Sequence, residues 1–76
     1  MAKNELIILN RTGDLKLLWS AQKQGEIDAA RQMFEDMRNQ GYLAYTVTKD
    51  GDKGEVIRKF DPDAEKIIMA PQMQGG

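Results

Sequence analysis

Apolar and polar residues alternate with a strand period near both ends of this chain and recur with a helical period in its middle. The run ELIILN over 5–10 is short, apolar and β-branched. In the run LKLLW over 15–19, successive side chains lie on opposite faces of a strand, so Leu18 and Trp19 face different sides. The connection RTGD contains Gly13, which tolerates a positive φ, so the two runs predict a β-hairpin.

The middle of the chain predicts one amphipathic helix over 26–40. Arg38 lies in its last turn, where a cation complements the helix dipole, and Gly41 follows where a left-handed cap is expected. At the other end, Ser20 or Gln24 could cap an early turn. Five apolar residues recur at spacings of three and four and predict the core face: Ile27, Ala30, Met33, Phe34 and Met37.

The last third of the chain predicts two strands, a turn and a final strand. GYLAYTVT over 41–48 and EVIRKF over 55–60 are joined by a few polar residues, which favours an antiparallel pair. DPDAE over 61–65 is typical of a short turn. KIIMA over 66–70 is the last strand, and Pro71 closes it.

This element order predicts an α+β fold, in which one helix packs across one face of a mixed sheet of four or five strands. A terminal strand that follows the helix and two others often pairs centrally, beside the first strand. We expect one domain over 1–70 and a flexible tail over 71–76.

The composition limits the catalytic and metal-binding groups that the chain can supply. The 76 residues include no cysteine and no histidine, which excludes disulfides, thiolate nucleophiles, zinc fingers and the commonest general base. Asp61 and Asp63 flank Pro62 and fit a turn better than an acid/base pair. DGDKGE over 50–55 resembles the start of a calcium loop, but Gly54 occupies a ligand position. We expect no catalytic residues, no metal site and no cofactor.

The charge pattern argues against nucleic acid as a partner. Eleven Lys and Arg oppose twelve Asp and Glu, and the two signs interleave, whereas phosphate binding needs a clustered basic footprint. Arg58 and Lys59, for example, stand between Glu55 and Asp61. No apolar run approaches the ~20 residues of a membrane helix, and the polar start MAKNE lacks a signal peptide. We expect a cytoplasmic protein, monomeric and without membrane contact.

In its element order, its first hairpin LIILNRTGDLKLLW, the turn DPDAE and its final Gly75-Gly76, the chain resembles ubiquitin and the β-grasp sulfur carriers of prokaryotes. The tail PQMQGG is similar to that of the molybdopterin synthase small subunit, with Pro71 and Met73 in matching places. It lacks that family's second proline and the arginines of the ubiquitin tail. The resemblance implies a β-grasp fold and activation of the Gly76 carboxylate by an adenylating enzyme, then transfer to an acceptor protein or a sulfur-transfer enzyme.

A different class of function stays open. Terminal glycines also fit a frayed chain end, and the protein could be an unconjugated interaction or adaptor module that binds a partner through the uncovered face of its sheet. For that partner face we predict four residues: Leu18, Tyr42, Ala44 and Ile68.

Overall fold

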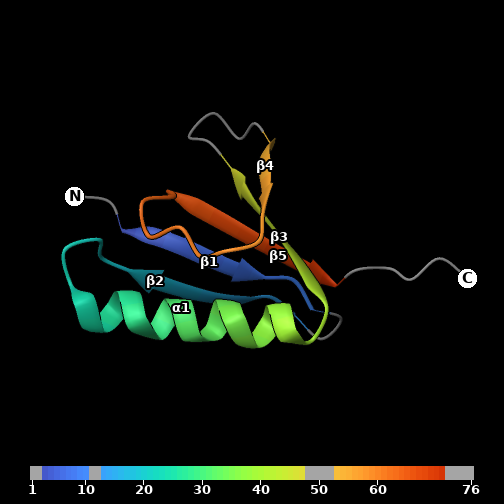
Figure 1. Cartoon of the computed structure of the whole chain (residues 1–76), viewed down its shortest axis with the longest axis horizontal. Helices are drawn as coiled ribbons and strands as arrows, with labels where there is room; N and C mark the ends of the chain where they lie inside the picture. The colour runs from blue at the N-terminus through green and yellow to red at the C-terminus, as the bar shows by residue number, and fades with distance from the viewer. Residues whose placement is uncertain (1–2, 11–12, 48–52, 72–76) are drawn as a thin grey trace, which may run out of the picture.

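The computed structural model describes residues 3–10, 13–47 and 53–71, and within them it places one helix and five strands. In Figure 1 the helix runs along one side of the sheet, and β4 stands well away from it. The predicted elements are all present, with ends that differ by a few residues. In chain order they are β1 (Asn4–Ile8), β2 (Leu15–Trp19), α1 (Gln24–Asn39), β3 (Tyr42–Val47), β4 (Lys53–Ile57) and β5 (Lys66–Pro71).

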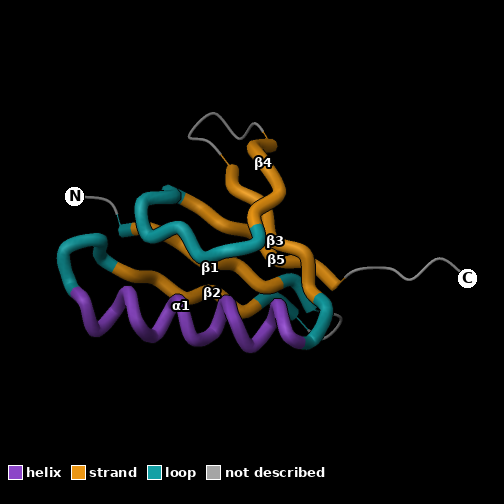
Figure 2. The backbone as a smooth tube through the Cα atoms, in the orientation of Figure 1, coloured by secondary structure: helices purple, strands orange, loops and turns teal. Residues whose placement is uncertain are grey.

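The strands form one mixed sheet in the order β2-β1-β5-β3-β4. β1 and β5 are parallel, and every other neighbouring pair is antiparallel. The hairpin prediction is confirmed, since β1 pairs with β2 and Gly13 has a φ of 134°. This sheet, with one helix on one face (Figure 2), is the predicted α+β architecture in a β-grasp arrangement. The terminal strand is central, as expected.

The core lies between α1 and the sheet face that it covers. Leu6, Ile67 and Met69 from β1 and β5 are fully buried there, together with Trp19 from β2. From the helix, Ile27, Ala30 and Phe34 point toward them, so the predicted helical stripe is largely confirmed. Burying one large apolar side chain contributes roughly 1.5–3 kcal/mol, which makes this face the main source of stability.

The two ends of α1 are built differently. Gly41 has a φ of 97° and donates its N–H to the Arg38 carbonyl at 3.0 Å, so the predicted left-handed cap is confirmed. At the start, Lys23 is the N-cap and no side chain caps the helix, so neither Ser20 nor Gln24 caps α1 itself. Ser20 Oγ accepts a hydrogen bond from the Gln22 N–H at 3.3 Å, in the turn before the helix. The Ser20 N–H donates to Glu26 Oε1 at 2.8 Å.

The turn between β4 and β5 is fastened to the first hairpin by side chains. Trp19 donates its indole N–H to the Pro62 carbonyl at 3.1 Å, and Asn4 Nδ2 donates to the Ala64 carbonyl at 2.6 Å. Inside the turn, the Asp63 N–H donates to Asp61 Oδ1 at 3.0 Å. These two aspartates therefore act as turn residues, as predicted.

Candidate functional site

The first candidate site is the point where the chain leaves β5. Pro71 is the last residue of that strand and is exposed. It is paired with Tyr42 of β3, so the sheet extends one residue past the expected boundary at 70. β5 lies between β1 and β3; its pairing with β1 ends at Met69, and its pairing with β3 continues to Pro71. Met73, Gly75 and Gly76, which complete the predicted tail site, lie outside the described residues.

The second candidate site is the sheet face opposite the helix, which we call the open face. Paired residues in neighbouring strands share a face. An apolar row therefore crosses four strands on this side, through Ile7, Ile68, Tyr45 and Val56. Val56 is 60% exposed. Leu18 on β2 lies on the same face and is 46% exposed.

Two of the four predicted partner-face residues lie on the open face and two do not. Leu18 and Ile68 are on it, and their role in binding stays a prediction. Placing Tyr42 and Ala44 there was wrong: Ala44 is paired with Met69 and fully buried under the helix, and Tyr42 packs against the same core. A shift of one residue exchanges the two faces of a strand, and the alternation in β3 does not say which set faces the helix.

The strand pairing places four further apolar residues on the open face that were not predicted from the sequence. They are Ile7, Leu43, Tyr45 and Val56. The small side chain of Ala44 could have indicated which face of β3 lies under the helix, because a small residue in the middle of an apolar strand fits beneath a packed helix better than Tyr45 does.

The open face also carries a charged cluster beside its apolar row. The Glu5 carboxylate lies 3.0 Å from Lys16 Nζ and 3.7 Å from Lys66 Nζ. The hydrogen bond from Lys16 holds the pKa of Glu5 below its ordinary value; burial opposes this effect, and the charges of both lysines add to it. Glu5 is therefore ionised near neutral pH, and the face combines an apolar strip with a compensated polar border.

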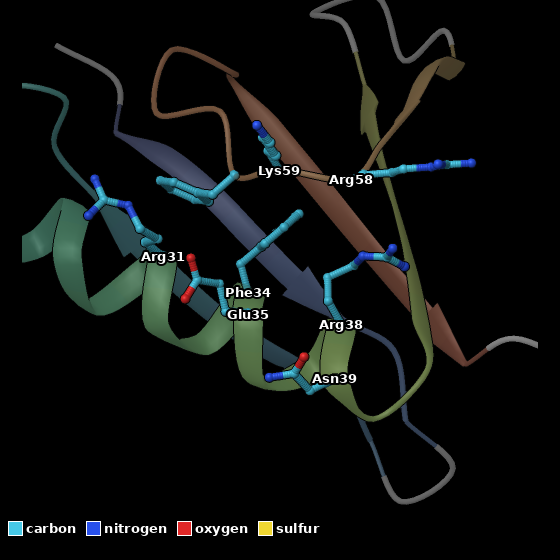
Figure 3. Close-up of a pocket in the computed structure, with 8 residues that line it drawn as sticks. Arg31, Phe34, Glu35, Arg38, Asn39, Arg58 and Lys59 are labelled. Carbon is cyan, nitrogen blue, oxygen red and sulfur yellow. The ribbon is translucent and has the colours of Figure 1, made fainter.

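A third feature is a cleft between the C-terminal half of α1 and residues 58–60, with a volume of about 580 Å³. Figure 3 shows side chains from the helix on one side and from the segment after β4 on the other. Four cations and one carboxylate line the cleft together with an aromatic pair. The lining residues are Arg31, Phe34, Glu35, Arg38, Asn39, Arg58, Lys59 and Phe60.

Two further features were sought in the part of the chain that the structure describes: a cluster of acidic side chains and a membrane-spanning helix. No group of three or more Asp and Glu side chains there could hold a metal ion, and Asp50 and Asp52 of the calcium-like stretch lie outside that part. No helix there is both long and apolar enough to cross a membrane.

Comparison with known proteins adds no relative. No protein family, curated protein or solved structure matches this chain. Any function proposed for this chain therefore rests on its own residues and on the strand order of its sheet.

Proposed function

We propose that this chain is a small ubiquitin-like carrier or protein modifier, activated at the carboxylate of Gly76 by an adenylating enzyme. The observation that carries the proposal is a central β5 that ends at Pro71 and is followed in sequence by Met73 and Gly75-Gly76. The protein would not itself be an enzyme. Its partners would be the adenylating enzyme and an acceptor protein or a sulfur-transfer enzyme, in the cytoplasm where ATP is supplied.

The chemistry would take place at the carboxylate of Gly76, outside the described residues. The Gly76 carboxylate attacks the α-phosphorus of ATP and releases pyrophosphate, and a sulfur donor or a lysine amine then displaces AMP from the adenylate. Two glycines suit this step because no side chain hinders threading into an enzyme. The five residues after Pro71 span at most ~18 Å. The enzyme's ATP site would therefore lie within that reach of the surface that receives the end of β5.

Mass spectrometry of the intact protein tests this proposal. The chain is incubated with ATP, Mg²⁺ and the adenylating enzyme encoded beside its gene, and an adenylate, a thiocarboxylate or a conjugate is expected. One alanine appended after Gly76 should abolish these products, because the glycine carboxylate is then no longer free. The same alanine inserted after Met1 is the matched control and should change nothing. Absence of every product, or equal products from the extended tail, would overturn the proposal.

A second function, an interaction module that needs no activation, is favoured by the open face. The large apolar side chains of Leu18 and Val56 are 46% and 60% exposed, on the side that α1 does not cover. Exposed apolar surface of this kind is typical of protein partner sites.

Two leucines of one strand give a matched test of this second function. Leu18 on the open face and Leu15 on the helix side of β2 are 46% and 49% exposed. Leu18→Asp should weaken the affinity for the protein encoded by the neighbouring gene by about tenfold or more, while Leu15→Asp should leave that affinity unchanged. Calorimetric titration gives both affinities, with a tag after Gly76 to block activation. An equal loss of affinity in the two variants would argue against the open face as the binding surface.

A further inference from the structure

The cleft beside α1 concentrates positive charge in a protein that is slightly acidic as a whole. Its lining holds four of the eleven basic residues and one of the twelve acidic residues, while the chain carries a net charge of −1. The remaining surface is therefore acidic. Such segregation creates a local positive potential that attracts an anionic ligand to the cleft.

The cations of the cleft are only partly neutralised by the protein itself. Arg31 lies 3.3 Å from the exposed carboxylate of Asp28, which compensates it in part. Arg38 donates from Nη1 to the Tyr42 carbonyl at 2.7 Å, and its buried Nε has no hydrogen-bond partner among the described residues. Arg58 and Lys59 are exposed, and the structure places no carboxylate of its described part within ion-pair distance of either.

The spacing of the cations selects among anions. Arg31 and Arg38 are seven residues apart on one helix, so their Cα atoms are ~10 Å apart along the axis. Figure 3 shows their side chains pointing in different directions, which favours two separate anionic groups over a single carboxylate or phosphate. An extended, polyproline-like peptide repeats the same side every three residues and advances ~9 Å in that distance. Two acidic side chains three residues apart therefore match the two arginines.

The floor of the cleft suits an apolar side chain between those two acids. The Phe34 and Phe60 rings meet edge to face with centroids 5.7 Å apart, and Phe60 is half-buried. Phe60 also packs on Trp19 at 5.0 Å, so this floor is part of the core and is held rigid. A preformed floor lowers the cost of ordering a bound segment.

We infer that this cleft binds a short acidic segment of a partner protein, in which two carboxylates three residues apart flank an apolar residue. A long nucleic acid is disfavoured, since eleven of the twelve carboxylates lie elsewhere on the chain and would repel its phosphates. The inference stands apart from activation at Gly76, because such binding would occur in a chain that is never adenylated.

Fluorescence anisotropy with a labelled peptide tests the inference. The probe has two glutamates that flank a leucine and a proline, and the reference peptide has glutamines in their place. At low salt the glutamate peptide should bind at least about fivefold more tightly. Arg58→Glu should weaken it by a similar factor. Lys23→Glu, an equal charge change at the exposed N-cap of α1, should have less than a twofold effect.

Amide chemical shifts locate the bound peptide. Changes should gather at residues 31–39 and 58–60 and spare Ile7, Leu18 and Ile68 on the open face. Equal binding of the two peptides, equal loss in the Lys23 and Arg58 variants, or shifts centred on the open face would overturn the inference. So would a single-stranded oligonucleotide that binds the cleft more tightly than the glutamate peptide does.

Discussion

The two faces of this sheet are made from the same strands and differ in how deeply their side chains are buried. In β5, Ile67 is fully buried under the helix, while its neighbour Ile68 is half-buried on the open face. Both are isoleucines in the middle of a central strand, so the residue type does not distinguish them. The position of α1 does. Stability is therefore concentrated on the helix side, whereas the open face keeps apolar side chains partly exposed.

The largest expected effect tests this division directly. Ile67→Ala should lower the free energy of unfolding by about 2–5 kcal/mol, because it leaves a cavity in a fully packed core. Ile68→Ala removes the same atoms from a half-buried site and should cost less than about half as much. Urea denaturation followed by the fluorescence of Trp19 measures both. Similar losses of unfolding free energy in the two variants would mean that Ile68 on the open face is as tightly packed as Ile67.

The next effect concerns β4, which lies at the sheet edge. A Cβ at Gly54 would lie 2.8 Å from the Thr46 carbonyl oxygen, at an irregularity in the β3–β4 pairing. Gly54→Ala should therefore destabilise the fold by about 1–3 kcal/mol, since backbone must shift. Gly25→Ala is the control, as a Cβ there meets nothing within 4 Å, and it should be neutral or slightly stabilising in the helix. Thermal unfolding measures the stability of both variants, and a Gly54→Ala protein as stable as the unmodified protein would contradict the prediction.

The smallest effect lies in the charged cluster of the open face. The folded pKa of Glu5 is lowered by Lys16 and Lys66, so the carboxylate stabilises the fold above its ordinary pKa of 4.5, and this contribution is lost as the pH falls through the folded pKa. Glu5→Gln should cost less than about 1 kcal/mol at pH 7, because the lysines are solvent-exposed.

Urea denaturation at several pH values measures this contribution. The gap between Glu5→Gln and the unmodified protein should narrow below pH 4.5, and 1 M salt should shrink it at pH 7. A gap that stays constant with pH would show that Glu5 acts through packing rather than charge.

Much of the architecture could be predicted because it depends on local patterns. The helical stripe, the strand alternation around Trp19, and the glycines at 13 and 41 each require only a few neighbouring residues. The fold class followed from their order. Capping at the start of the helix was mispredicted because the Ser20 backbone bonds to Glu26, six residues away, and no side chain serves as the N-cap.

The candidate site was less predictable because it depends on which segments meet in space. Whether Ala44 or Tyr45 faces the helix is decided by the pairing of β3 with β5, more than twenty residues along the chain. In the same way, Arg58 and Lys59 look like part of a mixed surface until the fold brings them opposite Arg31 and Arg38. No local pattern contains that juxtaposition.

The central position of β5 also bears on how the protein is made. β5 joins the β1–β2 hairpin to the β3–β4 pair, and of the five strands it is the last to be synthesised. Its parallel partner β1 is the first, so the pairing of Leu6 with Ile67 spans nearly the whole chain. Such a non-local contact slows folding, because the loop must close before the contact can form. During synthesis, the edges of β1 and β3 that pair with β5 therefore stay unpaired until residues 66–71 have left the ribosome.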